Sequence, residues 1–160
     1  MRRIGLIAIL GSLGLLALVM GSGTATATLP SGVTANFTSR ATISEHHFDS
    51  SDYKLFQKNS EDVVVRQLTY APGGNSGWHS HPGPTYVVVV SGVISLYEAA
   101  DPTCTARTFG PGEGFVELPG DVHITRNETN QNAVALVTFL DVPVGGAFRI
   151  EAPVPGNCPF

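Results

Sequence analysis

Short runs of apolar and β-branched residues recur along the chain from about residue 61 onward, with Gly- and Pro-rich turns between them. The runs have the length of strands, and no useful stretch repeats its apolar residues with a helical period. Ser91-Gly92, placed between two such runs, indicates a β-hairpin. The pattern predicts strands at 63–70, 86–90, 93–97, 107–109, 115–117, 123–127, 133–140 and 148–150. Short strands at this regular spacing predict an all-β sandwich or barrel.

The N-terminal segment has a different pattern. Arg2 and Arg3 precede an apolar run over residues 4–20, and Ala25-Thr26-Ala27 then supplies the small residues that a signal peptidase reads. The apolar run is short for a membrane span and contains glycine and serine. We therefore expect residues 1–27 to be a signal peptide cleaved after Ala27, with an uncleaved anchor as the alternative. Processing would deliver a protein without a membrane span outside the cell or into the cell envelope.

The remaining chain divides into three parts by composition. Residues 28–60 are rich in Ser, Thr, Asn and charge, so we expect an N-terminal arm with short strands near 41–43 and 53–57. Residues 61–152 carry the strand pattern, and 153–160 form a C-terminal tail. The arm contains two adjacent histidines, His46 and His47, which would point to opposite faces of a strand and are expected to be exposed.

Charge and cysteine content narrow the partners and the compartment. The net charge is −4, and it would become −6 without the two N-terminal arginines. This acidic balance, with no basic cluster, argues against nucleic acid as a partner. Cys104 and Cys158 are the only cysteines and both follow the signal peptide, so we expect a disulfide that ties the tail to the 101–104 loop. Two unrelated free thiols are the alternative.

Three histidines carry the candidate chemistry. His79 and His81 are two residues apart, so on an extended segment both side chains point to one face. His123 follows the Pro119-Gly120 turn at the start of a later strand. Imidazoles suit Fe, Mn, Zn, Ni or Cu, and a His-x-His pair needs at least one further ligand. We therefore expect His79, His81 and His123 to bind one divalent transition metal.

The residues around these histidines fall into two spaced groups. The first runs Gly73, five residues, His79-Ser80-His81, three residues, Thr85, six residues, Gly92. The second runs Gly112, five residues, Leu118-Pro119-Gly120, two residues, His123, three residues, Asn127. Over about residues 63–140 this order resembles the two motifs of the cupin superfamily. The resemblance implies a single jelly-roll β-barrel with the metal near one mouth, a small-molecule ligand or substrate, and a possible homodimer.

Two features depart from the cupin pattern. The proline of the second motif is shifted by one place, to Pro119, which is a minor change. The glutamate that family members use as a fourth metal ligand is replaced by Thr85, or by Tyr86 under the longer spacing. The expected centre therefore has three histidines, and Glu113 or Glu117 could supply a carboxylate in place of the missing one.

Further residues are candidates for the pocket. Trp78 either lines its mouth or belongs to the core, and Tyr86 and Thr85 lie at the position of the missing ligand. Arg66 stands within a valine-rich strand, so its charge either faces solvent or finds an internal partner such as Glu117.

The functional hypotheses follow from the metal site and the fold together. The first is an exported cupin metalloprotein, with dioxygenase chemistry on a small organic molecule as the leading reaction class. The second is a barrel that binds a small ligand without chemistry, because no nucleophile–base pair is evident. The third is a metal-dependent isomerase with Glu117 as its general base. A structural domain with vestigial histidines is the remaining alternative.

Overall fold

The computed structural model describes residues 26–158 and 160. The expected signal peptide therefore lies outside the described residues except for Thr26 and Ala27. The described part consists of strands joined by turns, and it contains no helix long and apolar enough to cross a membrane. The strands are β1 (Ser31–Ile43), β2 (His46–Asp49), β3 (Lys54–Gln57), β4 (Glu61–Asn75), β5 (His79–Ser80), β6 (Thr85–Ser91), β7 (Ile94–Glu98), β8 (Arg107–Phe109), β9 (Gly114–Glu117), β10 (His123–Arg126), β11 (Ala133–Val142) and β12 (Ile150–Glu151).

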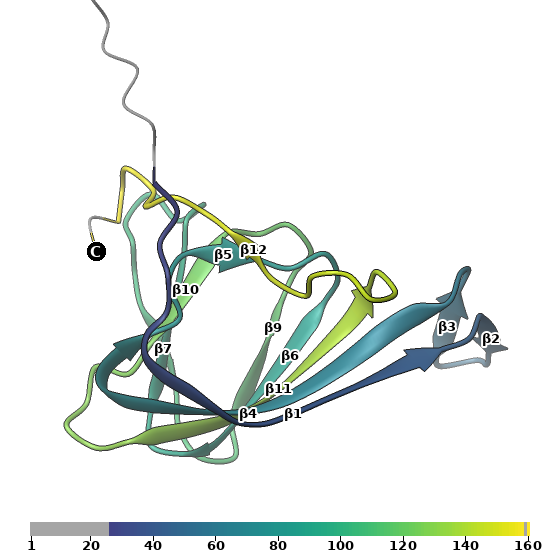
Figure 1. Cartoon of the computed structure of the whole chain (residues 1–160), viewed down its shortest axis with the longest axis horizontal. Helices are drawn as coiled ribbons and strands as arrows, with labels where there is room; N and C mark the ends of the chain where they lie inside the picture. The colour runs from purple at the N-terminus through teal and green to yellow at the C-terminus, as the bar shows by residue number, and fades with distance from the viewer. Residues whose placement is uncertain (1–25, 159) are drawn as a thin grey trace, which may run out of the picture.

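Ten of these strands form one antiparallel sheet that folds into two facing layers (Figure 1). One layer has the order β1-β4-β11-β6-β9, and the other has the order β12-β5-β10-β7-β8. The layers meet in the ladder where Asn75 of β4 pairs with Arg126 of β10. The result is a nearly closed β-barrel, so the predicted all-β jelly-roll class is confirmed.

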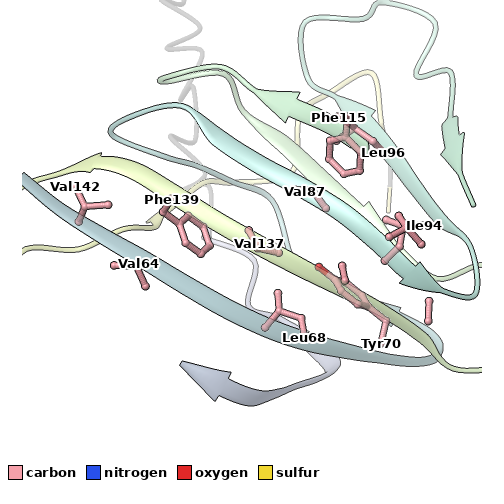
Figure 2. Packing of buried hydrophobic residues seen from close by; sticks show 13 residues of the cluster. Val64, Leu68, Tyr70, Val87, Ile94, Leu96, Phe115, Val137, Phe139 and Val142 are labelled. Atoms are coloured by element: carbon pink, nitrogen blue, oxygen red, sulfur yellow. The ribbon is translucent and has the colours of Figure 1, made fainter. Parts of the chain in front are cut away.

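The interior is filled by alternate residues of the strands. β4 contributes Val64, Leu68 and Tyr70, and its neighbour β11 contributes Val137 and Phe139 (Figure 2). Successive strand residues point to opposite faces, so β6 and β11 each present one row to the core and one row outward. In β6 this alternation buries positions 85, 87 and 89 and exposes positions 86, 88 and 90, although the strand is apolar on both faces.

The stretch expected as an N-terminal arm contains more strand than its sequence indicates. β1 pairs with β4 along nearly its whole length, from Ser31–Asn75 to Ile43–Glu61. Most of its side chains are exposed, so it carries no alternating apolar row that would reveal it in the sequence. β2 and β3 form a separate hairpin that stands at the far end of β1 and β4 (Figure 1). There His47 is exposed and His46 is half-buried.

A disulfide joins Cys104 to Cys158, with 5.4 Å between the two Cα atoms. Cys158 is fully buried in a second apolar cluster with Trp78, Tyr97 and Ile124. The Asn157 side chain also donates a hydrogen bond to the Ala99 carbonyl, at 3.2 Å. The disulfide thereby fixes the tail to the 101–104 loop, as the sequence predicted, and the contact with Ala99 adds to it.

We expect the double variant Cys104→Ser/Cys158→Ser to lose about 4 kcal/mol of unfolding free energy. The two cysteines are 54 positions apart, and opening so long a loop enlarges the conformational entropy of the unfolded chain. Urea denaturation of the variant tests this, and wild-type protein held in reductant should show the same loss. A loss below about 1 kcal/mol in both would show that the disulfide is not a main source of stability.

Candidate metal centre

The three histidines lie together on one layer of the barrel. His79 of β5 stands opposite His123 of β10 in the strand register, and His81 follows directly after β5. All three are buried, and their potential ligand nitrogens lie within 4.8 Å of one another. The turn into β5 needs Gly77, which has φ +67° and whose missing Cβ would stand 2.7 Å from the Thr28 carbonyl oxygen. The expected grouping of the three histidines is therefore confirmed.

Backbone carbonyls orient the three imidazole rings. Nδ1 of His79 lies 2.8 Å from the Gly77 oxygen, and Nδ1 of His123 lies 2.8 Å from the Asp121 oxygen. Nδ1 of His81 lies 2.7 Å from the oxygen of Phe148. Since a carbonyl oxygen only accepts hydrogen bonds, we assign the proton of each neutral ring to Nδ1. Each Nε2 is then a free acceptor, which is the form of histidine that ligates a metal.

A carboxylate completes the cluster from the opposite layer. Glu117 ends β9, and its Oε2 and Oε1 lie 3.1 Å from Nε2 of His81 and 3.1 Å from Nε2 of His123. Both Nε2 atoms are buried and have no aligned hydrogen-bond partner. Lone pairs of nitrogen and carboxylate oxygen therefore face each other, an arrangement that a cation between them would stabilise. Three imidazoles and one carboxylate fit a divalent transition metal.

The electrostatics of the cluster keep the His79 ring neutral and the Glu117 carboxylate ionised. Burial, with His123, Arg149 and His81 nearby, lowers the pKa of His79 to about 2, so this ring stays neutral. Burial also raises the pKa of Glu117, but His123 and His81 outweigh that effect and hold it below its ordinary value. Glu117 in turn raises the pKa of His123 against the effect of burial. The carboxylate is thus ionised and ready to neutralise a cation.

Glu117 stands directly across from the threonine that replaces the motif glutamate. Thr85 begins β6 and pairs in register with Glu117 of β9, so both side chains share one face of the sheet. The Thr85 hydroxyl is fully buried and has no hydrogen-bond partner. Glu113, the other carboxylate considered from the sequence, is exposed and accepts a hydrogen bond from the Gly110 amide. The carboxylate of the cluster therefore lies on β9, the strand that neighbours the one carrying Thr85.

A cavity of about 120 Å³ adjoins the cluster inside the barrel. His79, His81 and Glu117 line it together with apolar side chains that include Val137 and Phe139. Tyr70 reaches its wall, where the phenol oxygen lies 3.0 Å from Oγ1 of Thr125. Burial raises the pKa of Tyr70 to about 12, so the phenol keeps its proton at neutral pH.

The other pocket candidates occupy different places. Trp78 is fully buried in the apolar cluster around Cys158, and its indole nitrogen donates to the Phe160 carbonyl at 2.8 Å. Tyr86 is 49% exposed, so its expected place in the pocket is wrong, because the alternation of β6 turns it outward. Arg66 lines the cavity, but its Nε donates to Thr38 at 3.2 Å and not to Glu117.

Two residues beside the centre were missed in the sequence. Phe148 supplies the carbonyl that orients His81, and its ring packs on Phe139 at 4.8 Å between centroids. Arg149 donates to the Ser76 carbonyl at 2.6 Å and forms an ion pair with Glu151. Both follow the last long strand and lie outside the two spaced motifs, so no spacing signal could place them.

A nearly closed antiparallel barrel with a buried histidine cluster on β5 and β10 defines the cupin class of protein. Residues 66–139 match the family described as "Cupin domain". The part of the chain that carries the barrel and the histidines is therefore a cupin domain.

Among curated proteins it is similar to germin-like protein 3-2 of Oryza sativa subsp. japonica, with 34% identity over 83 residues, which are 51% of this chain and 37% of that protein. It is also similar to the rhicadhesin receptor of Pisum sativum, with 30% identity over 108 residues, 62% of this chain and 49% of the receptor. The chain thus spans less than half the length of either relative. Among solved structures, the polyketide cyclase RemF of Streptomyces resistomycificus has a TM-score of 0.49 and 18% identity, covering 77% of this chain and 76% of that one.

Proposed function

We propose that this protein holds one divalent transition metal through Nε2 of His79, His81 and His123 and the carboxylate of Glu117. The observation that carries the proposal is the buried convergence of these acceptors, with both Glu117 oxygens 3.1 Å from histidine nitrogens that have no hydrogen-bond partner. Fe, Mn, Zn, Ni and Cu all accept such ligands, and when bound such an ion would supply Lewis-acid or redox chemistry at the cavity wall.

The reaction class that we propose is a metal-dependent dioxygenase acting on a small organic molecule. Four protein ligands leave two positions of a six-coordinate ion for small molecules. The cavity lies directly beside His79, His81 and Glu117, so a molecule held there would be next to those positions. Its mainly apolar walls would hold the hydrocarbon part of a substrate.

The isomerase hypothesis has less support. A general base works best with a pKa near the working pH, whereas His123 and His81 hold the pKa of Glu117 below its ordinary value despite burial. Its two oxygens also both face the histidine nitrogens, at 3.1 Å each, and not the cavity alone.

The second candidate function is a barrel that binds a small ligand and does no chemistry. The pair formed by Tyr70 and Thr125 favours it, because these two hydroxyl groups contact each other and the phenol pKa of about 12 makes it a poor proton donor.

Elemental analysis of the mature chain, residues 28–160, tests the metal proposal. We expect about one equivalent of a divalent transition metal per chain in protein purified without chelators, because the ligand set is single and buried. Dialysis against EDTA and reloading with each of the five candidate metals would then rank their affinities. Failure to retain any of them after reloading would contradict the proposal and leave the ligand-binding barrel as the better function.

Two further proposals concern location and assembly. We propose that the protein is exported, since its cysteines form a disulfide and its first residues have the pattern of a signal peptide. We also propose a homodimer through β1, which pairs with β4 on one side and has no strand on its other edge among residues 26–158 and 160. N-terminal sequencing of the exported chain and light scattering test the two.

A further inference from the structure

An arginine occupies an inward-facing position of the barrel. Along β4, the residues two positions before and after Arg66, Val64 and Leu68, are both buried in the core, and Tyr70 continues the same row. Arg66 shares their face because side chains alternate along a strand. It is half-buried and lines the same cavity as His79, His81 and Glu117.

The guanidinium group of Arg66 is held in place by uncharged partners. Its Nε donates to Oγ1 of Thr38 at 3.2 Å, and its Cζ lies 5.2 Å from the centroid of the Phe148 ring. These contacts fix one edge and one face of the planar group and use one of its five N–H donors. The remaining donors are free to bind a planar anion in two parallel hydrogen bonds.

Arg66 differs from the other arginines in lacking a carboxylate. Within the ranges that the structure describes, every other arginine forms an ion pair: Arg40 with Asp62, Arg107 with Glu98, Arg126 with Glu128 and Arg149 with Glu151. The half-buried guanidinium of Arg66 has no counter-charge, so an anion that enters the cavity would gain a charge-assisted hydrogen-bonded pair there. The missing partner of Arg66 is therefore expected to be an anion that enters the cavity.

The charges around the cavity favour the same ligand. Arg149 and Glu151 neutralise each other, so the charges that remain are Arg66 and Glu117. A divalent ion on the histidines would make the total positive. The walls beside Arg66 are apolar, with Leu68, Val137 and Phe139 among them. A dry apolar cavity of about 150 Å³ takes up a molecule the size of benzene, so the volume of about 120 Å³ admits a molecule of at most about that size.

We propose that this cavity binds a small organic carboxylate, with its carboxylate group on Arg66 and its hydrocarbon part against Val137 and Phe139. The inference rests on the proposed function in that it names the class of molecule brought to the metal centre. Arg66 is then the residue that selects an anion over a neutral molecule of the same shape.

Butanoate and butanamide are suitable probes, because they have the same number of heavy atoms and differ in charge. NMR titration of the wild-type protein, as purified with its metal, should show butanoate binding about tenfold more tightly than butanamide. In Arg66→Met this preference should fall to about twofold or less, because the charged guanidinium group is gone. The matched control is Arg107→Met, which removes the same charge from an exposed ion pair with Glu98 and should keep the preference.

The same titrations after metal removal separate this proposal from the metal assignment. A preference for butanoate that depends on Arg66 in protein without metal supports the anion site even if no metal is ever retained. A preference that Arg66→Met leaves unchanged, or its absence in the wild type, overturns the proposal whatever the metal content. If Arg66→Met does not fold, as judged by its thermal melt, Arg66→Lys replaces it. This variant keeps the positive charge but cannot form two parallel hydrogen bonds to a carboxylate, so the preference should fall about threefold. An unchanged preference again overturns the proposal.

Discussion

Replacing His79 and His123 together by alanine is expected to reduce bound metal from about one equivalent per chain to less than about a tenth. The variant removes two of the four converging acceptors, and His81 with Glu117 alone cannot hold a divalent ion against a competing chelator. Elemental analysis after gel filtration measures the loss. Both rings are buried, so circular dichroism must show that the variant is folded.

The matched control for this variant is His46→Ala/His47→Ala. This control also removes two imidazoles, but it takes them from the β2–β3 hairpin, which stands apart from the barrel (Figure 1). We expect this control to keep its full equivalent of metal. Loss of metal from the control, or retention of metal by a folded His79→Ala/His123→Ala protein, would show that the ion binds elsewhere.

Glu117→Gln should weaken metal binding by at least about tenfold to a hundredfold, as measured by competition with a chromophoric chelator. The amide keeps the size of the side chain but loses the negative charge that faces Nε2 of His81 and His123. The matched control is Glu98→Gln, whose carboxylate pairs with Arg107 on the surface. Equal affinity of Glu117→Gln and wild type would show that Glu117 only accompanies the histidines and is not a ligand.

The swap variant Thr85→Glu/Glu117→Thr tests whether a carboxylate at position 85 can take the place of the one at position 117. Because the two positions are paired in register across β6 and β9, their Cβ atoms are about 5 Å apart on the same face. A glutamate at position 85 should therefore reach the same three nitrogens. We expect the swap to recover affinity to within about tenfold of the wild type, well above Glu117→Thr alone. A folded swap variant with no recovery would mean that the two positions are not equivalent.

The sequence was sufficient for most of the barrel strands after residue 60, which carry a local periodicity, and for the histidine cluster, which follows from the spacing of its residues. His79 and His81 are two residues apart, and the second motif places His123 at the start of a strand, so the barrel brings them together. The carboxylate was harder to place. Glu113 and Glu117 were equal candidates, because only the pairing of β9 with β6, a contact distant in sequence, shows that Glu117 reaches the cluster.

Other features lacked any local signal. β1 is a strand by its backbone pairing with β4, while its exposed side chains form no apolar row. Tyr86 was ambiguous because β6 is apolar on both faces, so the sequence could not say which row points inward. Phe148 takes part through its carbonyl oxygen, a group that every residue has and that no sequence pattern can single out.

The four acceptors come from two different layers of the barrel, and this affects how the barrel can open. The histidines belong to the layer that contains β5 and β10, whereas Glu117 belongs to β9 in the facing layer. The two layers are joined by backbone pairing between β4 and β10 at Asn75 and Arg126. An ion bound by both His123 and Glu117 would thus cross-link the two layers of the barrel. Separating the layers during unfolding would then require release of the ion.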